Sequence, residues 1–249
     1  MAQNEFTGIK GKIFNRDTIK YLAMLTMLLD HIAIIFLPAD NFLAETFIDM
    51  GCFTAPTMCF FLVEGYEYTS SKKKYCQRLL LFAVLSQIPY ALAFEFGNLN
   101  MIFTLLCCFL ILVILDQIRH PVLRTALCTC TALVTVISDW ALFAPIYTIL
   151  FRNSRGDRAR LSRSFAAAYG MFALLNIVSY MMRPGYTAAG AVISGLADGM
   201  GILVSAAVIL FLYNGKRAGS GRTFSKWFFY LFYPAHLFLL FLIKLFVLE

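Results

Sequence analysis

Long apolar runs, separated by short polar and charged stretches, repeat along almost all of the 249-residue chain. An α-helix rises about 1.5 Å per residue, so about 20 apolar residues cross the hydrocarbon core of a bilayer. The pattern therefore predicts an all-α, polytopic membrane bundle of about nine transmembrane helices, over residues 19–37, 48–68, 79–96, 101–118, 125–137, 140–151, 165–182, 187–213 and 227–248.

The fifth and sixth of these helices are expected to be short because few residues are available for them. Only 27 residues separate Arg124 from Arg152, about 40 Å of helix, which is too little for two full spans. A single span would place the arginines from 152 to 163 on the outer side. We therefore expect two short helices that meet at Ser138–Asp139, below the outer surface, in a turn that lines a wet cavity.

The positive charge is concentrated between the apolar runs. Of the 21 Lys and Arg residues, 19 fall into five clusters, which is typical of cytoplasmic loops in membrane proteins. We expect a cytoplasmic N-terminal segment (residues 1–16) and a single membrane domain (residues 17–249). The net charge of +7 thus indicates membrane topology and no nucleic-acid partner. The seven cysteines lack zinc-ligand spacing, so no metal site is expected.

The first apolar run contains ionisable residues at a depth where they are costly, Asp30 and His31. Lys20 lies eleven residues before His31, and eleven steps of about 100° return to within about 20° of the starting direction. Lys20, Met24, Met27 and His31 are therefore expected on one face, with the cation at the cytoplasmic end and the imidazole about 16 Å deeper.

Two other polar residues fall at a similar depth. His236 on the last helix and Asp198 on the eighth are expected near His31 in the middle of the membrane. Glu64 and Arg78 are expected near Lys20, at the cytoplasmic face. This arrangement suits acyl-CoA, because cations bind the phosphates while pantetheine carries the thioester inward to an imidazole that accepts a proton.

Several motifs in order along the chain resemble the TraX family, named for a conjugation protein that N-acetylates pilin. They are K-Y-L-A-M-L-T-M-L-L-D-H-I (20–32), P-x-M-x-F-F-L-V-E-G-Y (56–66), K-Y-C-Q-R-L (74–79), Q-I-P-Y (87–90), I-F-T-L (102–105), S-D-W (138–140) and F-Y-L-F-Y-P-A-H-L (229–237). That family is similar in turn to transmembrane acyltransferases, in which a basic residue precedes a catalytic histidine by the spacing of Lys20 and His31.

The resemblance implies a bacterial inner-membrane acyltransferase that uses acetyl-CoA as co-substrate and a peptide amine or glycan on the extracytoplasmic side as acceptor. The predicted catalytic residues are His31, Asp30 and His236. Lys20, Arg78 and Glu64 are predicted to bind the cofactor, Glu64 as an ion-pair partner of Lys20. Asp139, Tyr233 and Asp198 are predicted to bind the acceptor.

Two other classes of function stay open from the sequence. A non-catalytic assembly factor would use the same polar residues for packing and interhelical hydrogen bonds. A proton-coupled transporter would use Asp30, Asp198 and the histidines as a relay, although no internal repeat favours this alternative.

Overall fold

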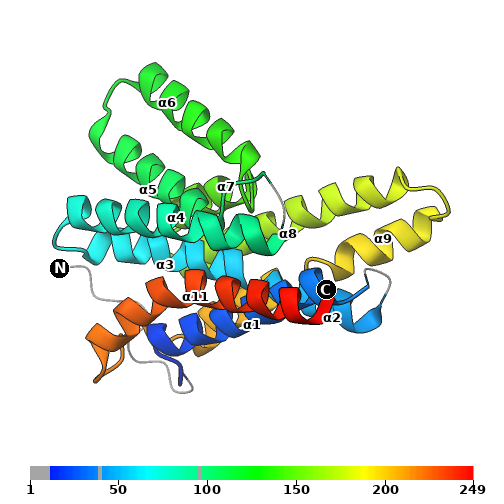
Figure 1. Ribbon diagram of the computed structural model, residues 1–249. Coiled ribbons are helices and arrows are strands. Elements are labelled where there is room, and N and C mark those ends of the chain that lie inside the picture. The colour runs from blue at the N-terminus through cyan, green and yellow to red at the C-terminus, as the bar shows by residue number, and fades with distance from the viewer. Residues whose placement is uncertain (1–11, 39–40, 95–96, 249) are drawn as a thin grey trace. The chain divides into compact units, whose positions relative to one another are not determined.

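A computed structural model describes residues 12–38, 41–94 and 97–248, and every regular element within them is helical (Figure 1). The elements are α1 (Arg16–Phe36), α2 (Phe42–Gly51), α3 (Thr54–Tyr68), α4 (Lys72–Phe94), α5 (Met101–Gln117), α6 (Pro121–Val134), η1 (Thr135–Ile137), α7 (Phe143–Asn153), α8 (Arg158–Met181), α9 (Ala188–Ala197), α10 (Met200–Ala207), η2 (Val208–Leu212) and α11 (Arg222–Leu248). Residues 1–11 of the expected N-terminal segment, and residues 95 and 96 of the expected third helix, lie outside the described residues.

Six helical stretches in the described residues are long and apolar enough to cross a membrane. They are α1, α2 with α3, α4, α8, α9 through η2, and α11. The expected count of nine spans is therefore wrong. Within the described residues each of the nine apolar runs is mainly helical, but α5, α6 with η1, and α7 are too short, and the 11 residues of α7 reach only about 16 Å.

The chain divides into two compact units, which are described separately. The first comprises residues 1–58 and 153–220, and the second comprises residues 59–152 and 221–249. In the first unit α1 packs on α2, α2 on α10, and α8 on α9, its antiparallel neighbour (Figure 1). In the second unit α4 packs on both α5 and α11, and α5 packs on α6.

Two candidate spans are broken at points that both belong to the first unit, and these breaks lie against each other. The α2–α3 span is interrupted at Cys52 and Phe53, and the α9–α10 span at Asp198 and Gly199. A Cβ atom on Gly201 would lie 2.4 Å from the Asp49 carbonyl oxygen and 2.6 Å from the Phe53 nitrogen. The backbones of α2 and α10 therefore approach so closely that only glycine fits at position 201.

The expected pair of short helices is confirmed in the second unit. The α6 helix with η1 ends at Ile137, α7 begins at Phe143, and Ser138–Asp139 lies in the turn between them. That turn pairs with the loop before α5, because Leu99 donates to the Ile137 carbonyl at 2.8 Å and Asp139 donates to the Leu99 carbonyl at 2.9 Å. The start of α5 and the end of η1 are thereby fixed together.

Candidate functional site

The face of α1 predicted from the sequence is present in the structure. Asn15 caps the helix by accepting from the Thr18 N–H at 2.9 Å, and the helix then runs unbroken to Phe36. Met24, Met27 and His31 are buried, with His31 only 4% exposed, and Lys20 is half-buried. Because the helix is continuous, about 16 Å of helix axis separates Lys20 from His31.

Asp30 lies beside His31 but does not hold it by a direct hydrogen bond. Asp30 Oδ2 is 3.9 Å from His31 Nε2, which is longer than a hydrogen bond. The Asp30 side chain is packed against α2, since a Cβ atom on Gly51 would lie 2.6 Å from the Asp30 Cβ. The carboxylate therefore adds negative charge near the imidazole and has little room to move.

Asp198 lies at the break between α9 and α10 and not inside a continuous helix. Its Oδ1 accepts from the Tyr180 hydroxyl at 3.4 Å. Asp30, Asp49 and Asp198 all lie within electrostatic range of the buried Cys52 thiol. The structure thus gathers three carboxylates near the two helix breaks. Asp49 was not among the site residues predicted from the sequence, because it falls at the margin of an apolar run.

The second unit brings together four of the sequence motifs in one polar network. Buried Asn100 caps α5 by accepting from the Ile102 and Phe103 N–H groups, at 3.0 and 3.2 Å. Its amide donates to the Ala83 carbonyl at 2.7 Å and to Gln87 Oε1 at 2.8 Å. Residues from the Q-I-P-Y and I-F-T-L motifs therefore meet at the start of α5.

The S-D-W motif adjoins this network. The Thr104 hydroxyl lies 2.8 Å from Ser138 Oγ and 2.6 Å from the Asp139 carbonyl oxygen. Trp140 has a φ of 55°, a left-handed conformation that is costly for a bulky residue and common near functional sites. The main chain around Asp139 is therefore fixed from several directions.

The Asp139 carboxyl group is suited to proton transfer near neutral pH. Asp139 lies outside the six candidate spans. Burial raises the pKa of Asp139 to about 6, although the Trp140 main-chain N–H favours the ionised form. A carboxyl group with such a pKa is able to exist in either protonation state near pH 6.

Tyr233 and His236 from the last helix reach the same part of the second unit. The Tyr233 hydroxyl accepts from the Met101 N–H at 3.3 Å, at the first residue of α5. His236 is buried, its Nδ1 lies 2.8 Å from the Phe232 carbonyl oxygen, and its ring packs edge-on against Tyr233 at 5.5 Å. A hydrogen bond at Nδ1 leaves Nε2 as the atom that faces other groups.

The residues predicted to bind the cofactor are divided between the units. Lys20 belongs to the first unit, and Arg78 and Glu64 belong to the second. Arg78 stacks on the Tyr75 ring at 5.5 Å and is hydrogen-bonded with Tyr230. The joint site of Lys20 with these residues, and that of His31 with His236, stay predictions.

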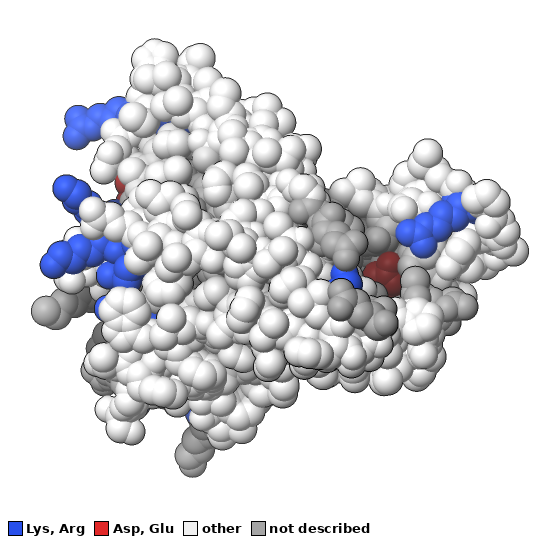
Figure 2. All heavy atoms as spheres, viewed as in Figure 1, with Lys and Arg blue, Asp and Glu red and all other residues white. Residues whose placement is uncertain are grey.

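Sequence reasoning missed a charged cluster around Asp116, at the end of α5. Its Oδ1 accepts from Arg152 Nη2 at 2.6 Å, and its Oδ2 accepts from Lys72 Nζ at 3.0 Å and from the Tyr66 hydroxyl at 2.8 Å. The available signal was a single carboxylate at the end of an apolar run, among basic loops. Figure 2 shows Lys and Arg side chains gathered at this end of the second unit.

Comparisons with known proteins identify the family of this chain. No solved structure matches it significantly. A protein of Dichelobacter nodosus described as a probable fimbrial assembly protein, FimC of serogroup H1, is 28% identical over 247 residues, which cover 94% of this chain and 97% of that protein. The family model described as TraX protein matches residues 15–244. That match takes in both units, from the start of α1 almost to the end of α11, and the chain belongs to the TraX family.

Proposed function

We propose that this TraX-family protein is a membrane-bound acetyltransferase, which moves an acetyl group from cytosolic acetyl-CoA to a peptide amine or glycan on the extracytoplasmic side of the bacterial inner membrane. The observation that carries the proposal is the buried imidazole of His31 on the same unbroken helix as Lys20, about 16 Å away. That length suits a pantetheine arm with its phosphates at Lys20 and its thioester at His31.

The chemistry assigned to His31 is general-base catalysis. The acceptor nitrogen or oxygen attacks the thioester carbonyl carbon, its proton passes to the imidazole, the C–S bond breaks, and CoA leaves as a thiolate that then takes up a proton. Asp30, 3.9 Å from the ring, stabilises the imidazolium formed in this step.

Acceptor recognition is assigned to the second unit. Asp139, held by the Leu99 and Thr104 contacts, supplies a carboxyl group with a pKa near 6. Tyr233 reaches the neighbouring start of α5, and His236 packs against Tyr233. The name of the Dichelobacter nodosus relative suggests that the acceptor is a fimbrial or pilin component.

The test uses the full-length protein in nanodiscs with radiolabelled acetyl-CoA and a panel of peptide amines, sugars and lipid headgroups. We expect His31→Ala to lower kcat by about 100-fold or more, the usual contribution of a general base. Lys20→Gln is expected to raise the KM for acetyl-CoA with a smaller effect on kcat. Ile34→Ala is the matched control, because Ile34 lies three residues after His31 on the same helix and is 45% exposed. This variant is expected to keep the wild-type rates. Full turnover by His31→Ala rejects the assigned base.

A non-catalytic assembly factor is the second candidate, favoured by the name of the fimbrial assembly relative. It predicts no saturable binding of acetyl-CoA by the wild-type protein. It also predicts that His31→Gln and Lys20→Gln support fimbrial assembly in cells as well as the wild type does. Acetyl-CoA binding that saturates and is weakened by Lys20→Gln excludes this alternative.

A further inference from the structure

We propose that Lys72, Arg124 and Arg152 form a binding site for a phosphate group at the cationic end of the second unit. The phosphate belongs either to a soluble phosphate ester, such as the adenosine phosphates of CoA, or to an anionic phospholipid headgroup. The CoA form of this proposal rests on the proposed acetyltransferase function, whereas the phosphate chemistry does not.

Asp116 organises two of these cations. One carboxylate oxygen accepts from Arg152 at 2.6 Å, and the other accepts from Lys72 at 3.0 Å. Tyr66 adds a third hydrogen bond to the carboxylate, and Lys72 Nζ also lies 3.9 Å from the centre of the Tyr66 ring. Lys72 and Arg152 are therefore held in place before any ligand arrives.

Arg124 brings a third positive charge to the same place. Cys128, one turn further along α6, lies within electrostatic range of both Arg124 and Arg152. The end of α7 and the first turn of α6 thus place two arginines close enough to the same thiol for both to act on it electrostatically. Lys72, Arg152 and Arg124 together with Asp116 carry an excess of two positive charges, which matches the charge of a phosphate monoester.

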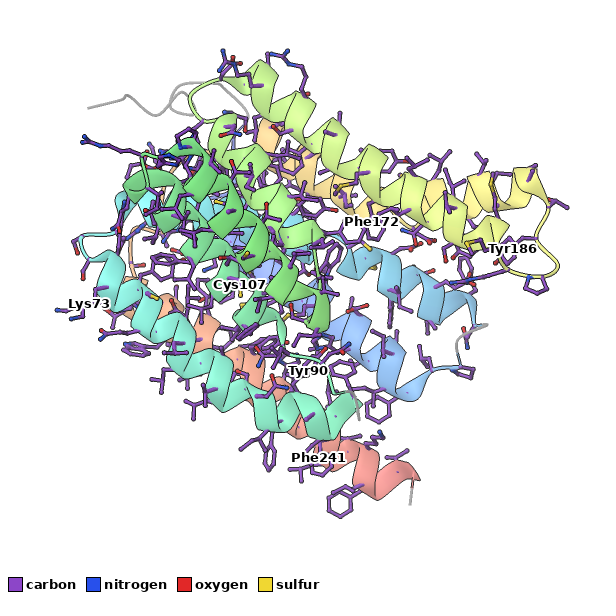
Figure 3. The ribbon with its side chains drawn as sticks, turned by 90° about the horizontal axis from the view of Figure 1, so that it is seen from above. Lys73, Tyr90, Cys107, Phe172, Tyr186 and Phe241 are labelled. Carbon is purple, nitrogen blue, oxygen red and sulfur yellow. The ribbon has the colours of Figure 1, made fainter. Side chains whose placement is uncertain are left out.

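The geometry differs from that of an ordinary cytoplasmic loop, whose lysines serve as topology signals and extend into solvent. Lys73 is such a residue, and Figure 3 shows it projecting away from the helices at the start of α4. Arginine binds phosphate through two parallel N–H groups, and orientation of the side chain beforehand reduces the entropy lost on binding. An arginine and a lysine held in place, with a second arginine nearby, are therefore more selective for phosphate than mobile loop lysines are.

The experiment compares Arg124→Gln with Lys73→Gln in the full-length protein. Arg124→Gln leaves the hydrogen bonds to Asp116 intact, so it is expected to fold, and Lys73→Gln removes the same charge a short distance away. Thermal unfolding is followed with pyrophosphate and with CoA, each against sodium chloride of equal ionic strength. Retention of phosphatidylglycerol is measured by native mass spectrometry after reconstitution in mixed phosphatidylcholine–phosphatidylglycerol nanodiscs.

Three outcomes decide the proposal. If Arg124→Gln weakens pyrophosphate and CoA binding about tenfold and Lys73→Gln does not, the site binds soluble phosphate esters. If Arg124→Gln loses phosphatidylglycerol while CoA binding is unchanged, the ligand is a lipid headgroup. If the two variants affect every probe equally, or neither affects any probe, the proposal is overturned. The pyrophosphate and lipid measurements need no acetyl transfer, so failure of the proposed enzyme activity is recognised separately.

Discussion

Gly201→Ala tests the contact between the two broken spans of the first unit. The added methyl carbon would lie 2.4 Å from the Asp49 oxygen, 2.6 Å from the Phe53 nitrogen and 2.8 Å from the Cys52 carbonyl carbon. Ordinary contacts of a Cβ atom lie at 3.4 Å or more, so the helices must separate by about 1 Å. All three obstructing atoms belong to the main chain, and no side-chain rotation relieves the clash.

The magnitude follows from three terms. Overpacking costs about 1–3 kcal/mol. Separation of the helices stretches the 2.8 Å hydrogen bond between Thr57 and Ser205, one turn further along, which contributes about 1 kcal/mol. Alanine favours the helix more than glycine does, which stabilises the folded state by about 1 kcal/mol. We therefore expect a net loss of about 1–3 kcal/mol in the free energy of unfolding.

The assay is thermal unfolding in detergent, followed with a thiol-reactive dye that reports exposure of the buried cysteines, which are Cys52, Cys59, Cys107 and Cys108. Gly170→Ala is the matched control, since no atom lies within 4 Å of the methyl position on α8, and it is expected to stabilise the protein by about 0.5–1 kcal/mol. Equal stabilisation by both substitutions would show that α2 and α10 do not approach as closely as described.

Three other predictions test separate parts of the structure. Asn100→Ala is expected to lower the free energy of unfolding in urea by about 2–4 kcal/mol, because it removes the α5 cap and the side-chain hydrogen bonds to the Ala83 carbonyl and to Gln87 Oε1. The raised pKa of Asp139 means that the folded state binds its proton more tightly than the unfolded state does. The contribution of Asp139 to stability, up to about 3 kcal/mol, is therefore present below about pH 4 and lost as the pH rises through 6. When unfolding is measured at several pH values, the free energy of unfolding of Asp139→Asn should depend less on pH than that of the wild type. Gly51→Ala is expected to displace Asp30 and increase the modification of His31 by diethylpyrocarbonate, measured by mass spectrometry, and an unchanged rate would contradict the packing described for α1.

Hydrophobic pattern and charge spacing were sufficient to locate the helices. The distance between Arg124 and Arg152 predicted two short helices and the position of their turn, both confirmed, because segment length and loop charge act locally. The burial of His31 was likewise predictable, because an ionisable side chain within an apolar run is costly in lipid, and its shared face with Lys20 follows from helix geometry.

Features that depend on contacts between distant segments were not predictable. Pro56, four residues after Cys52, is a local signal for the break after Gly51, but the close approach of Gly201 from another helix could not be read from the sequence. The role of Asp116 depends on partners 36 to 50 residues away in the chain. The count of nine spans was wrong because every apolar run was counted as a span, whereas α5, α6 with η1, and α7 keep close to the expected bounds and are too short to cross a membrane.

The hydrogen bonds of Asp116 also impose an order on biogenesis. Tyr66 and Lys72 precede Asp116 by 50 and 44 residues and have already left the ribosome when it emerges, whereas Arg152 follows it by 36 residues. During insertion by the translocon, α3, α4 and α5 are therefore able to form a partial assembly that is completed only when α7 arrives.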